Sequence, residues 1–438
     1  MNFNKLFAAA KKEGIEVCEI TTSKSKSLAF SLFHGELDNY SISSTFKTSA
    51  RGIYNGKLGS YTTEEDNKLT IPKVIEAIKV NSTLIEKAEK PIIFKGSKKY
   101  YKKNVFSKAI EEWSVEDKIK TLHQIEDKLK SLDSRVSEVE VSYNESASEE
   151  ILANSYGLNL KSKSNYFYFY GSVVVKQGEE IKSFYKLFLN SDPTKFNVDE
   201  FSKKIVDGAI ALLDSKPIKN KVYKAVLNQD SVSSLLNALL SNLSSEEIQK
   251  HSSLLEKKLE TQVFSKKLSV AEKRLNKNCF FQYFDDEGVA IVDKKVIEKG
   301  VIKTYFYNLE TAAKDNVETT GNARKMGSKI GIGFGSIVVK PGKSSLEDLF
   351  AKIGDGVYIT SLSGLHAGLD SQSGDFSLQA EGFSVVDGKK SDPLPLITVA
   401  GNLYTLFNDI IAIGNNSELL LDSTTTPSIA FKHIKVSS

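Results

Sequence analysis

The sequence predicts an α+β protein, with two small α/β subdomains in its N-terminal half and a β-rich C-terminal domain. Within residues 1–216, a group of strand-like runs followed by an amphipathic helix occurs twice. Beyond Phe280, glycines separate a series of further strand-like runs. A chain of 438 residues is also too long for one ordinary hydrophobic core. We therefore expect domains at 1–105, 106–216 and 217–438, with the last boundary near Pro217.

In the first subdomain, apolar spacing and turn signals define the elements. Asn55-Gly56 is the strongest of these signals, because both central residues of a tight hairpin turn need a positive φ. The expected elements are a helix over 2–12 ended by Gly14, strands at 15–21, 27–35 and 37–44, a hairpin over 50–59, a helix over 70–87 and a lysine-rich connector over 90–106.

The second subdomain and the C-terminal domain follow the same rules. Asn197 is the expected N-cap of the second subdomain's last helix, and Ser344-x-x-Glu347 predicts a capping box before a helix that Gly354 ends. The expected helices are 115–132, 198–213, 232–243 and 344–353, and the expected strands are 136–143, 158–171, 172–177, 223–227 and 336–340.

Composition restricts the classes of function. The 59 basic and 55 acidic side chains leave a net charge of only +4, which argues against nucleic-acid binding. The stretch Lys95–Lys103 mixes basic and aromatic side chains, but in so neutral a chain we expect a solvated linker. Two cysteines cannot form a disulfide framework and favour a reducing compartment. The N-terminus has no apolar signal region, and no apolar run reaches the roughly 18 residues of a membrane span. A cytoplasmic protein without membrane contact is expected.

Four sequence blocks in the last third carry a specific resemblance. They are Phe284–Ala290, Gly321–Arg324, Gly374–Ser377 and Ala400–Leu403. Their order and separation resemble the TldD/PmbA family, a group tied to zinc peptidase activity. Arg51-Gly52-x-x-x-Gly56-x-x-Gly59 and Asn154-Ser155-x-Gly157 extend the resemblance into the N-terminal half. The resemblance implies a PmbA/TldD-like fold and a dimer with a cleft or chamber between subunits.

Within that family the chain resembles the PmbA (TldE) branch, because the zinc-binding His-Glu-x-x-x-His of the TldD branch is absent. The helix that corresponds to it, 232–243, offers leucines, which supply no lone pair to zinc. The TldD branch also uses a C-terminal cysteine as a ligand, and residues 412–438 contain none. We therefore nominate no metal ligand, no cofactor and no catalytic residue in this chain. The resemblance implies that zinc belongs to a partner subunit.

Substrate or cleft candidates come from the same blocks. Asp285, Asp286 and Glu287 could be paired carboxylates for acid–base work, a divalent-ion site or a turn. The turn is favoured, because neighbouring strand residues point to opposite faces. Asn322 and Arg324 could bind a peptide backbone and a carboxylate, or could serve turn chemistry. The remaining candidates are His366, flanked by glycines, and Asp375 and Asn402 from the last two blocks.

The favoured function, implied by the resemblance, is the non-zinc subunit of a TldD-type metallopeptidase complex, which shapes the chamber and positions unstructured peptide. Its partner would be a TldD-type zinc peptidase subunit or a second copy of itself. Two alternatives stay open. One is a homodimeric peptide-binding module, and the other is an independent hydrolase with a site built from Asp286, Glu287 or His366.

Overall fold

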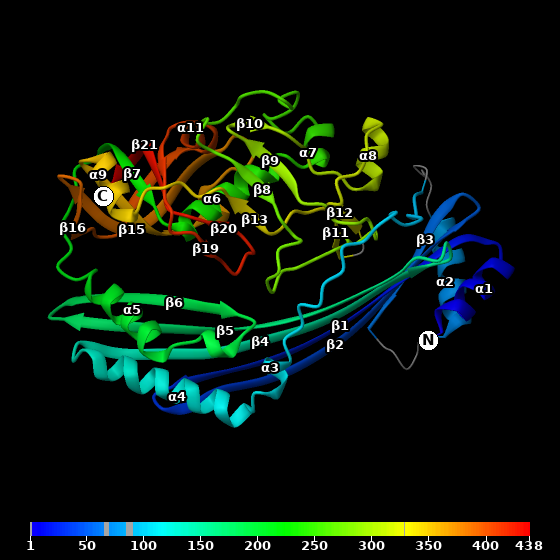
Figure 1. Cartoon of the computed structure of the whole chain (residues 1–438), viewed down its shortest axis with the longest axis horizontal. Coiled ribbons are helices and arrows are strands. Elements are labelled where there is room, and N and C mark those ends of the chain that lie inside the picture. The colour runs from blue at the N-terminus through cyan, green and yellow to red at the C-terminus, as the bar shows by residue number, and fades with distance from the viewer. Residues whose placement is uncertain (1, 65–69, 85–90, 328) are drawn as a thin grey trace.

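A long curved β-sheet supports the rest of the molecule. The computed structural model describes residues 2–64, 70–84, 91–327 and 329–438. The C-terminal half lies over one face of the long sheet, and helices cover parts of the other face and one end (Figure 1). This arrangement sets two large bodies face to face, with the chain connector running between them.

The long sheet has six antiparallel strands in the order β3-β2-β1-β4-β5-β6. Its strands are β1 (Ile15–Phe33), β2 (Glu36–Tyr54), β3 (Lys57–Thr63), β4 (Val136–Asn154), β5 (Asn159–Gln177) and β6 (Glu180–Asn190). The predicted hairpin at Asn55-Gly56 is confirmed, with φ of 50° and 69° at these residues.

The strands predicted for the long sheet were too short. The runs 15–21 and 27–35 are one continuous strand, β1, and 158–171 and 172–177 are likewise the single strand β5. The run 37–44 is only the first part of β2, and 136–143 only the first part of β4. In the sequence, polar stretches such as residues 22–27 of β1 look like the end of one strand and the start of another. In the sheet they are held by neighbouring strands on both sides, so the backbone stays paired without apolar side chains.

The two expected N-terminal subdomains share this one sheet. Strand β1, from residues 1–105, pairs with β4, from residues 106–216, all the way from Glu19 to Phe33. The connector at 91–106 forms no helix or strand. The backbone pairing across the expected boundary therefore makes the N-terminal half one continuous body.

Helices cover the long sheet in two groups. The helix α4 begins and ends as predicted, and α5 ends three residues before the predicted 213. Helix α2 ends at Thr83, and the last residues of the predicted helix, 85–87, lie outside the described residues. The helices of this half are α1 (Phe3–Lys12), α2 (Ile71–Thr83), α3 (Lys108–Glu112), α4 (Val115–Leu132), the 3₁₀ turn η2 (Pro193–Lys195) and α5 (Val198–Ile210).

Aromatic side chains build the core under α4 and α5. Tyr143, Phe167 and Phe169 are fully buried and touch one another, and Trp113 packs edge-on against all three. Asn197 caps α5 as predicted, because its side chain accepts a hydrogen bond from the Glu200 amide.

The C-terminal half contains two larger sheets and one hairpin. One sheet holds β14-β7-β21-β17-β15-β16, with β18 on β21, and the other holds β10-β9-β8-β13-β20-β19. The first sheet consists of β7 (Lys221–Leu227), β14 (Gly356–Ser363), β15 (Asp375–Val386), β16 (Lys389–Pro393), β17 (Ile397–Asn402), β18 (Ile410–Ile413) and β21 (Ile429–Ser437). The second consists of β8 (Val270–Glu272), β9 (Lys294–Glu298), β10 (Val301–Ile302), β13 (Ile337–Val339), β19 (Glu418–Leu419) and β20 (Thr425–Thr426), and the hairpin of β11 (Ala323–Met326) and β12 (Lys329–Ile332).

This half has more helix than predicted. Only two helices were expected there, near α6 and α9, because short helices carry too few turns for a periodic pattern. The capping box of α9 is one residue later than predicted: Ser345 is the N-cap and Asp348 its partner, not Ser344 and Glu347. The helices are α6 (Gln229–Ser241), α7 (Ser245–Gln249), α8 (Leu309–Asp315), α9 (Leu346–Ile353), α10 (Leu365–Gly368) and α11 (Leu403–Asn408). In the described part of the chain, no helix is long and apolar enough to cross a membrane.

Candidate functional site

The acidic block forms a tight turn around Asp285. This side chain is fully buried, and its carboxylate accepts hydrogen bonds from the backbone amides of Glu287, Val289 and Ala323, at 2.9 to 3.0 Å. The last of these bonds joins the first sequence block to the second, Gly321–Arg324. Burial raises the pKa of Asp285 to about 6, against the opposing effect of the three amide donors. Asp285 therefore organises the turn, as favoured from the sequence.

The two neighbouring carboxylates point to different partners. Asp286 accepts a hydrogen bond from the Lys325 amide at 2.6 Å. Glu287 is 4% exposed and accepts from the Leu309 amide at 2.8 Å, so it holds the first turn of α8. Asp286 and Glu287 thus extend the connections of the turn to β11 and α8 rather than forming a pair of adjacent carboxylates.

Charged residues of the long sheet lie close to this turn. Arg51 on β2 pairs with the buried Glu19 on β1, with 2.6 Å between Nε and Oε1. Arg51 also lies within electrostatic reach of Asp285 and Glu287. We call Glu19, Arg51, Glu150, Asp286, Glu287 and Lys325 the junction cluster. It brings three charged residues of the N-terminal half close to three of the C-terminal half.

Burial displaces the proton equilibria of the junction cluster. The pKa of Glu287 rises to about 7, mainly because the side chain is buried, although the Leu309 amide and Arg51 act in the other direction. The pKa of Glu150 also rises to about 7, through burial first and the negative charge of Asp286 second. Burial lowers the pKa of Lys325. The cluster can therefore exchange protons near neutral pH.

This shift predicts a pH-dependent stability that Glu287→Gln removes. The pKa of Glu287 is 4.5 without its surroundings and about 7 in the fold. Its contribution to stability is therefore present at low pH and lost as the pH rises through about 7. Relative to wild type, Glu287→Gln should gain stability between about pH 5 and about pH 8, by up to about 3 kcal/mol. Thermal denaturation across this pH range measures the gain.

The matched control is Glu310→Gln, which removes an exposed carboxylate from the same helix that Glu287 caps. Its difference from wild type should not vary with pH over this range. A constant offset for Glu287→Gln at every pH would contradict the assignment of a raised pKa to Glu287.

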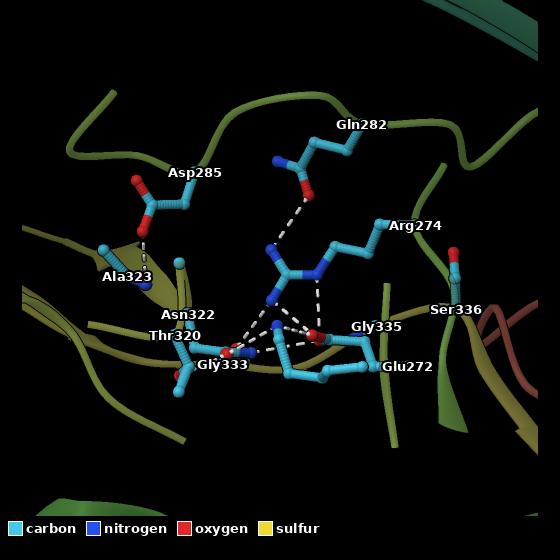
Figure 2. Close-up of polar contacts among 12 residues, drawn as sticks. Glu272, Arg274, Gln282, Asp285, Thr320, Asn322, Ala323, Gly333, Gly335 and Ser336 are labelled. Carbon is cyan, nitrogen blue, oxygen red and sulfur yellow. Dashed lines mark hydrogen bonds and ion pairs between the residues drawn. The ribbon is translucent and has the colours of Figure 1, made fainter. Parts of the chain in front are cut away.

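A second buried network lies directly beside the turn. Glu272 is fully buried and accepts hydrogen bonds from Arg274 Nε at 2.9 Å and from the Asn322 side-chain amide at 3.0 Å. Lys294 forms an ion pair with the other carboxylate oxygen. Figure 2 shows the Arg274 guanidinium beside the Glu272 carboxylate, with the Asn322 amide reaching both Glu272 and the Gly333 carbonyl. The side chain of Asn322 therefore has a structural role in this buried network.

The lysine-rich connector is packed against the turn rather than being a solvated linker. Tyr100 donates a hydrogen bond from its hydroxyl to the Gly288 carbonyl at 2.7 Å, and the Ala290 amide donates to Ser97 Oγ at 3.0 Å. The tyrosine ring packs against the apolar cluster around Tyr283. The composition of the connector predicted a linker exposed to solvent. In the structure, Tyr100 instead anchors the connector to the C-terminal half.

The other candidates lie elsewhere. Arg324 is exposed on β11, with its side chain lying over Gly333. His366 is exposed on α10. Asp375 and Asn402 meet on neighbouring strands, where the Asn402 amide donates to Asp375 at 2.9 Å and the Asn402 carbonyl oxygen caps α11. The structure therefore separates the eight candidates into the turn group of Asp285, Asp286, Glu287 and Asn322, the exposed Arg324 and His366, and the Asp375–Asn402 pair.

A large cavity lies at a different place, between the edge of the long sheet and the C-terminal half. Its volume is about 890 Å³, in the range of ligand sites in proteins. One wall is the edge strand β6 from Ser183 to Asn190, and the opposite wall includes the first turn of α6 and the segment 417–422. None of the eight candidates lines it.

Sequence reasoning did not find the cavity residues. Asp230, Glu381 and Asp422 line it, yet each looks like an ordinary helix, strand or turn residue in the sequence. One usable signal was the Asp-x-Thr of the segment 422–424, in which Asp422 accepts from the Thr424 amide in a local turn. Nothing local in the sequence says that this turn faces helix α6.

Comparison with protein-family models covers most of the chain. The PmbA/TldA metallopeptidase domain 1 matches residues 18–82, the central domain matches 108–213, and the C-terminal domain matches 220–438. A metalloprotease PmbA homolog of Buchnera aphidicola is 26% identical over 313 residues, which are 70% of this chain and 67% of the relative.

Solved structures give the same result for the fold. A Thermotoga maritima protein, solved as a candidate modulator of a DNA gyrase, superposes with a TM-score of 0.93 at 29% identity over 99% of both chains. TldE from Thermococcus kodakarensis superposes with a TM-score of 0.91 at 23% identity over the whole of both chains, a likeness of fold. The α+β, PmbA/TldD-like fold predicted from the sequence is confirmed, and the chain belongs to the PmbA/TldA (TldD/PmbA) metallopeptidase family.

Proposed function

We propose that this chain is the subunit of a TldD-type peptidase complex that carries no zinc site of its own. In this role it forms part of a chamber wall and positions extended peptide for a zinc-bearing partner. The proposal rests mainly on one observation: the two segments that hold zinc ligands in the TldD branch meet here through a closed hydrogen-bond cluster.

That cluster joins helix α6 to the C-terminal segment. Asp422 Oδ2 accepts from the Ser233 hydroxyl at 2.6 Å and from the Asn237 amide at 3.0 Å. Asn237 also donates to the Thr424 hydroxyl at 3.1 Å. Ser233 and Asn237 are one helical turn apart, so both side chains reach the same segment. The cluster satisfies its own polar groups at the place that the resemblance assigns to metal ligands.

The residues there do not fit zinc. Zinc in proteins prefers imidazole and thiolate ligands with a few carboxylates. The cavity lining contains neither histidine nor cysteine among the described residues, and Asp422 is already engaged by Ser233 and Asn237. Within the described ranges, no three or more His, Cys, Asp or Glu side chains gather closely enough to bind a metal ion. The side chains available at this place therefore support the proposal that this chain works beside a zinc ion held by its partner subunit.

The peptide-positioning role is supported by strand β6. In the part of the chain that the structure describes, β6 pairs with β5 alone, and its other edge faces the cavity. An open sheet edge binds an extended chain through main-chain hydrogen bonds, largely independently of the peptide sequence. Two unpaired buried cysteines agree with the reducing cytoplasm that we propose as the location of this complex.

Purification from the native cell tests the proposal. A tagged copy of the full chain should co-elute with a near-equal amount of a protein that carries His-Glu-x-x-x-His, identified by mass spectrometry. Zinc should be bound to that partner, and only the pair should cut unstructured peptides. Stoichiometric zinc and peptide cleavage by this chain alone would refute the proposal and favour an independent hydrolase. Recovery of this chain only with itself would favour the homodimeric peptide-binding module.

A further inference from the structure

The charged lining of the cavity is strongly unbalanced. Among the described residues, Asp230, Glu381, Glu418 and Asp422 line it, against the single cation Lys186. The whole chain, in contrast, carries a net charge of +4. The negative charge of the cavity is therefore a local feature, and it cannot come from the average composition of the surface.

The four carboxylates are not equivalent. Asp422 is engaged by Ser233 and Asn237, and Glu418 lies 3.9 Å from Lys186. Asp230 and Glu381 form no ion pair with any residue in the ranges that the structure describes. Lys186 lies within electrostatic reach of Asp230, but its ion pair is with Glu418, so Asp230 and Glu381 keep no salt-bridge partner of their own among the described residues.

Aromatic rings stand beside these acids. Tyr168, Tyr185 and Tyr358 all line the cavity, and Tyr185 is 54% exposed. Asp230 lies within electrostatic reach of both Tyr185 and Tyr358, and Glu381 within reach of Tyr185. The faces of aromatic rings attract ammonium and guanidinium groups, and a neighbouring carboxylate strengthens that attraction.

One buried polar group is also left without a partner. Ser231 is 1% exposed and lines the cavity, and its hydroxyl makes no hydrogen bond within the described structure. A buried hydroxyl without a partner is costly, so a bound group that accepts from it or donates to it would recover that cost. Ser231 follows Asp230 directly, at the start of α6.

We propose that the cavity selects extended peptide segments that carry lysine or arginine side chains. In this arrangement the peptide backbone runs along the open edge of β6. A cationic side chain reaches Asp230 and Glu381 between the tyrosine rings, and Ser231 bonds a polar group of the same segment. This inference rests on the proposed peptide-positioning role and adds the class of peptide that the site prefers.

Binding of three short peptides to the full-length protein tests the inference. All have capped ends and about ten residues of glycine and serine, enough to line a strand edge, with interspersed lysines, glutamates or neither. Fluorescence anisotropy should give binding of the lysine peptide at least about tenfold tighter than that of the glutamate peptide at low salt. This difference should shrink as salt is added.

The double variant Asp230→Asn and Glu381→Gln should remove the preference while leaving the neutral peptide unaffected, because both changes keep the shape of the side chain. Glu347→Gln is the matched control: it removes an acid from the first turn of another helix, α9, away from the cavity. That control should keep the full preference for lysine.

Equal affinity for lysine and glutamate peptides would overturn the inference, and so would an unchanged preference in the double variant. Absence of binding by all three peptides would overturn it as well. The proposed partnership has a separate readout, because co-elution with a His-Glu-x-x-x-His protein does not depend on which peptide is bound.

Discussion

Replacing Glu272 with alanine is expected to destabilise the C-terminal half severely. Glu272 is fully buried, and its carboxylate is shared by Arg274, Lys294 and Asn322. Burial alone would raise its pKa, but the two cations together hold the pKa below its ordinary value, so the side chain is charged in the fold. Alanine at this position leaves two cations that are 6% and 14% exposed without their counter-charge.

Breaking a buried ion pair by removing one partner costs about 3 to 5 kcal/mol, because the remaining charge stays desolvated. We expect a loss of this size for Glu272→Ala in urea denaturation followed by a probe in the C-terminal half. Glu272→Gln should lose less, because its side-chain oxygen still accepts from Arg274 and from the Gly335 amide.

Glu298→Ala is the matched control for this experiment. Glu298 also pairs with a lysine, Lys295, but both side chains are exposed. Exposed pairs contribute little because water and salt screen them, so this variant should unfold almost as wild type does. A loss for Glu272→Ala no larger than that for Glu298→Ala would mean that the buried network does not support the turn at Asp285.

Local signals in the sequence determined what could be predicted about the fold. The hairpin at Asn55-Gly56, the N-cap Asn197 and the helix over 115–132 depend on neighbouring residues, and each was predicted correctly. The length of β1 could not be predicted, because its polar middle is held by strands that are distant in sequence. Pairing with a distant strand overrides a weak local preference.

The candidate site shows the same division. The turn at Asp285 was predictable from Asp-Asp-Glu-Gly, since these residue types favour turns. Its electrostatic interactions with Arg51 and Glu150 depend on how the long sheet meets the C-terminal half, and no spacing in the sequence encodes that approach. The cavity is the extreme case, because Lys186, Asp230 and Asp422 come together from three separate segments.

The motif Arg51-Gly52-x-x-x-Gly56-x-x-Gly59 is explained position by position. Arg51 pairs with the buried Glu19, and a side chain at Gly52 would press on Ile15 and Ile78. Gly56 has a φ of 69° in the hairpin turn. Gly59 lies directly against helix α2. The arginine of the motif therefore pairs with Glu19, and its glycines let the hairpin of β2 and β3 turn tightly and pack against α2.

Gly59→Ala is consequently expected to displace helix α2 from the sheet. A Cβ atom at this position would lie 1.8 Å from the Ile78 carbonyl oxygen and 2.7 Å from its carbon. These are main-chain atoms in the middle of α2, so no change of rotamer relieves the overlap. The cost should reach the upper range for overpacked sites, about 3 kcal/mol or more. The buried contacts of Val74 and Ile78 would be lost with the docking of the helix.

Hydrogen exchange of residues 71–83, together with thermal denaturation, distinguishes displacement of α2 from general unfolding, because the amides of an undocked helix lose their protection first. Gly335→Ala is the matched control: its Cβ would meet only the Ser423 hydroxyl at 3.6 Å, an ordinary contact, and the Gly335 amide would still reach Glu272. We expect Gly335→Ala to retain the exchange pattern of wild type and Gly59→Ala to lose protection throughout α2. Unchanged protection of α2 in Gly59→Ala would mean that the hairpin of β2 and β3 can shift away from the helix, and that the motif glycine is not required for its docking.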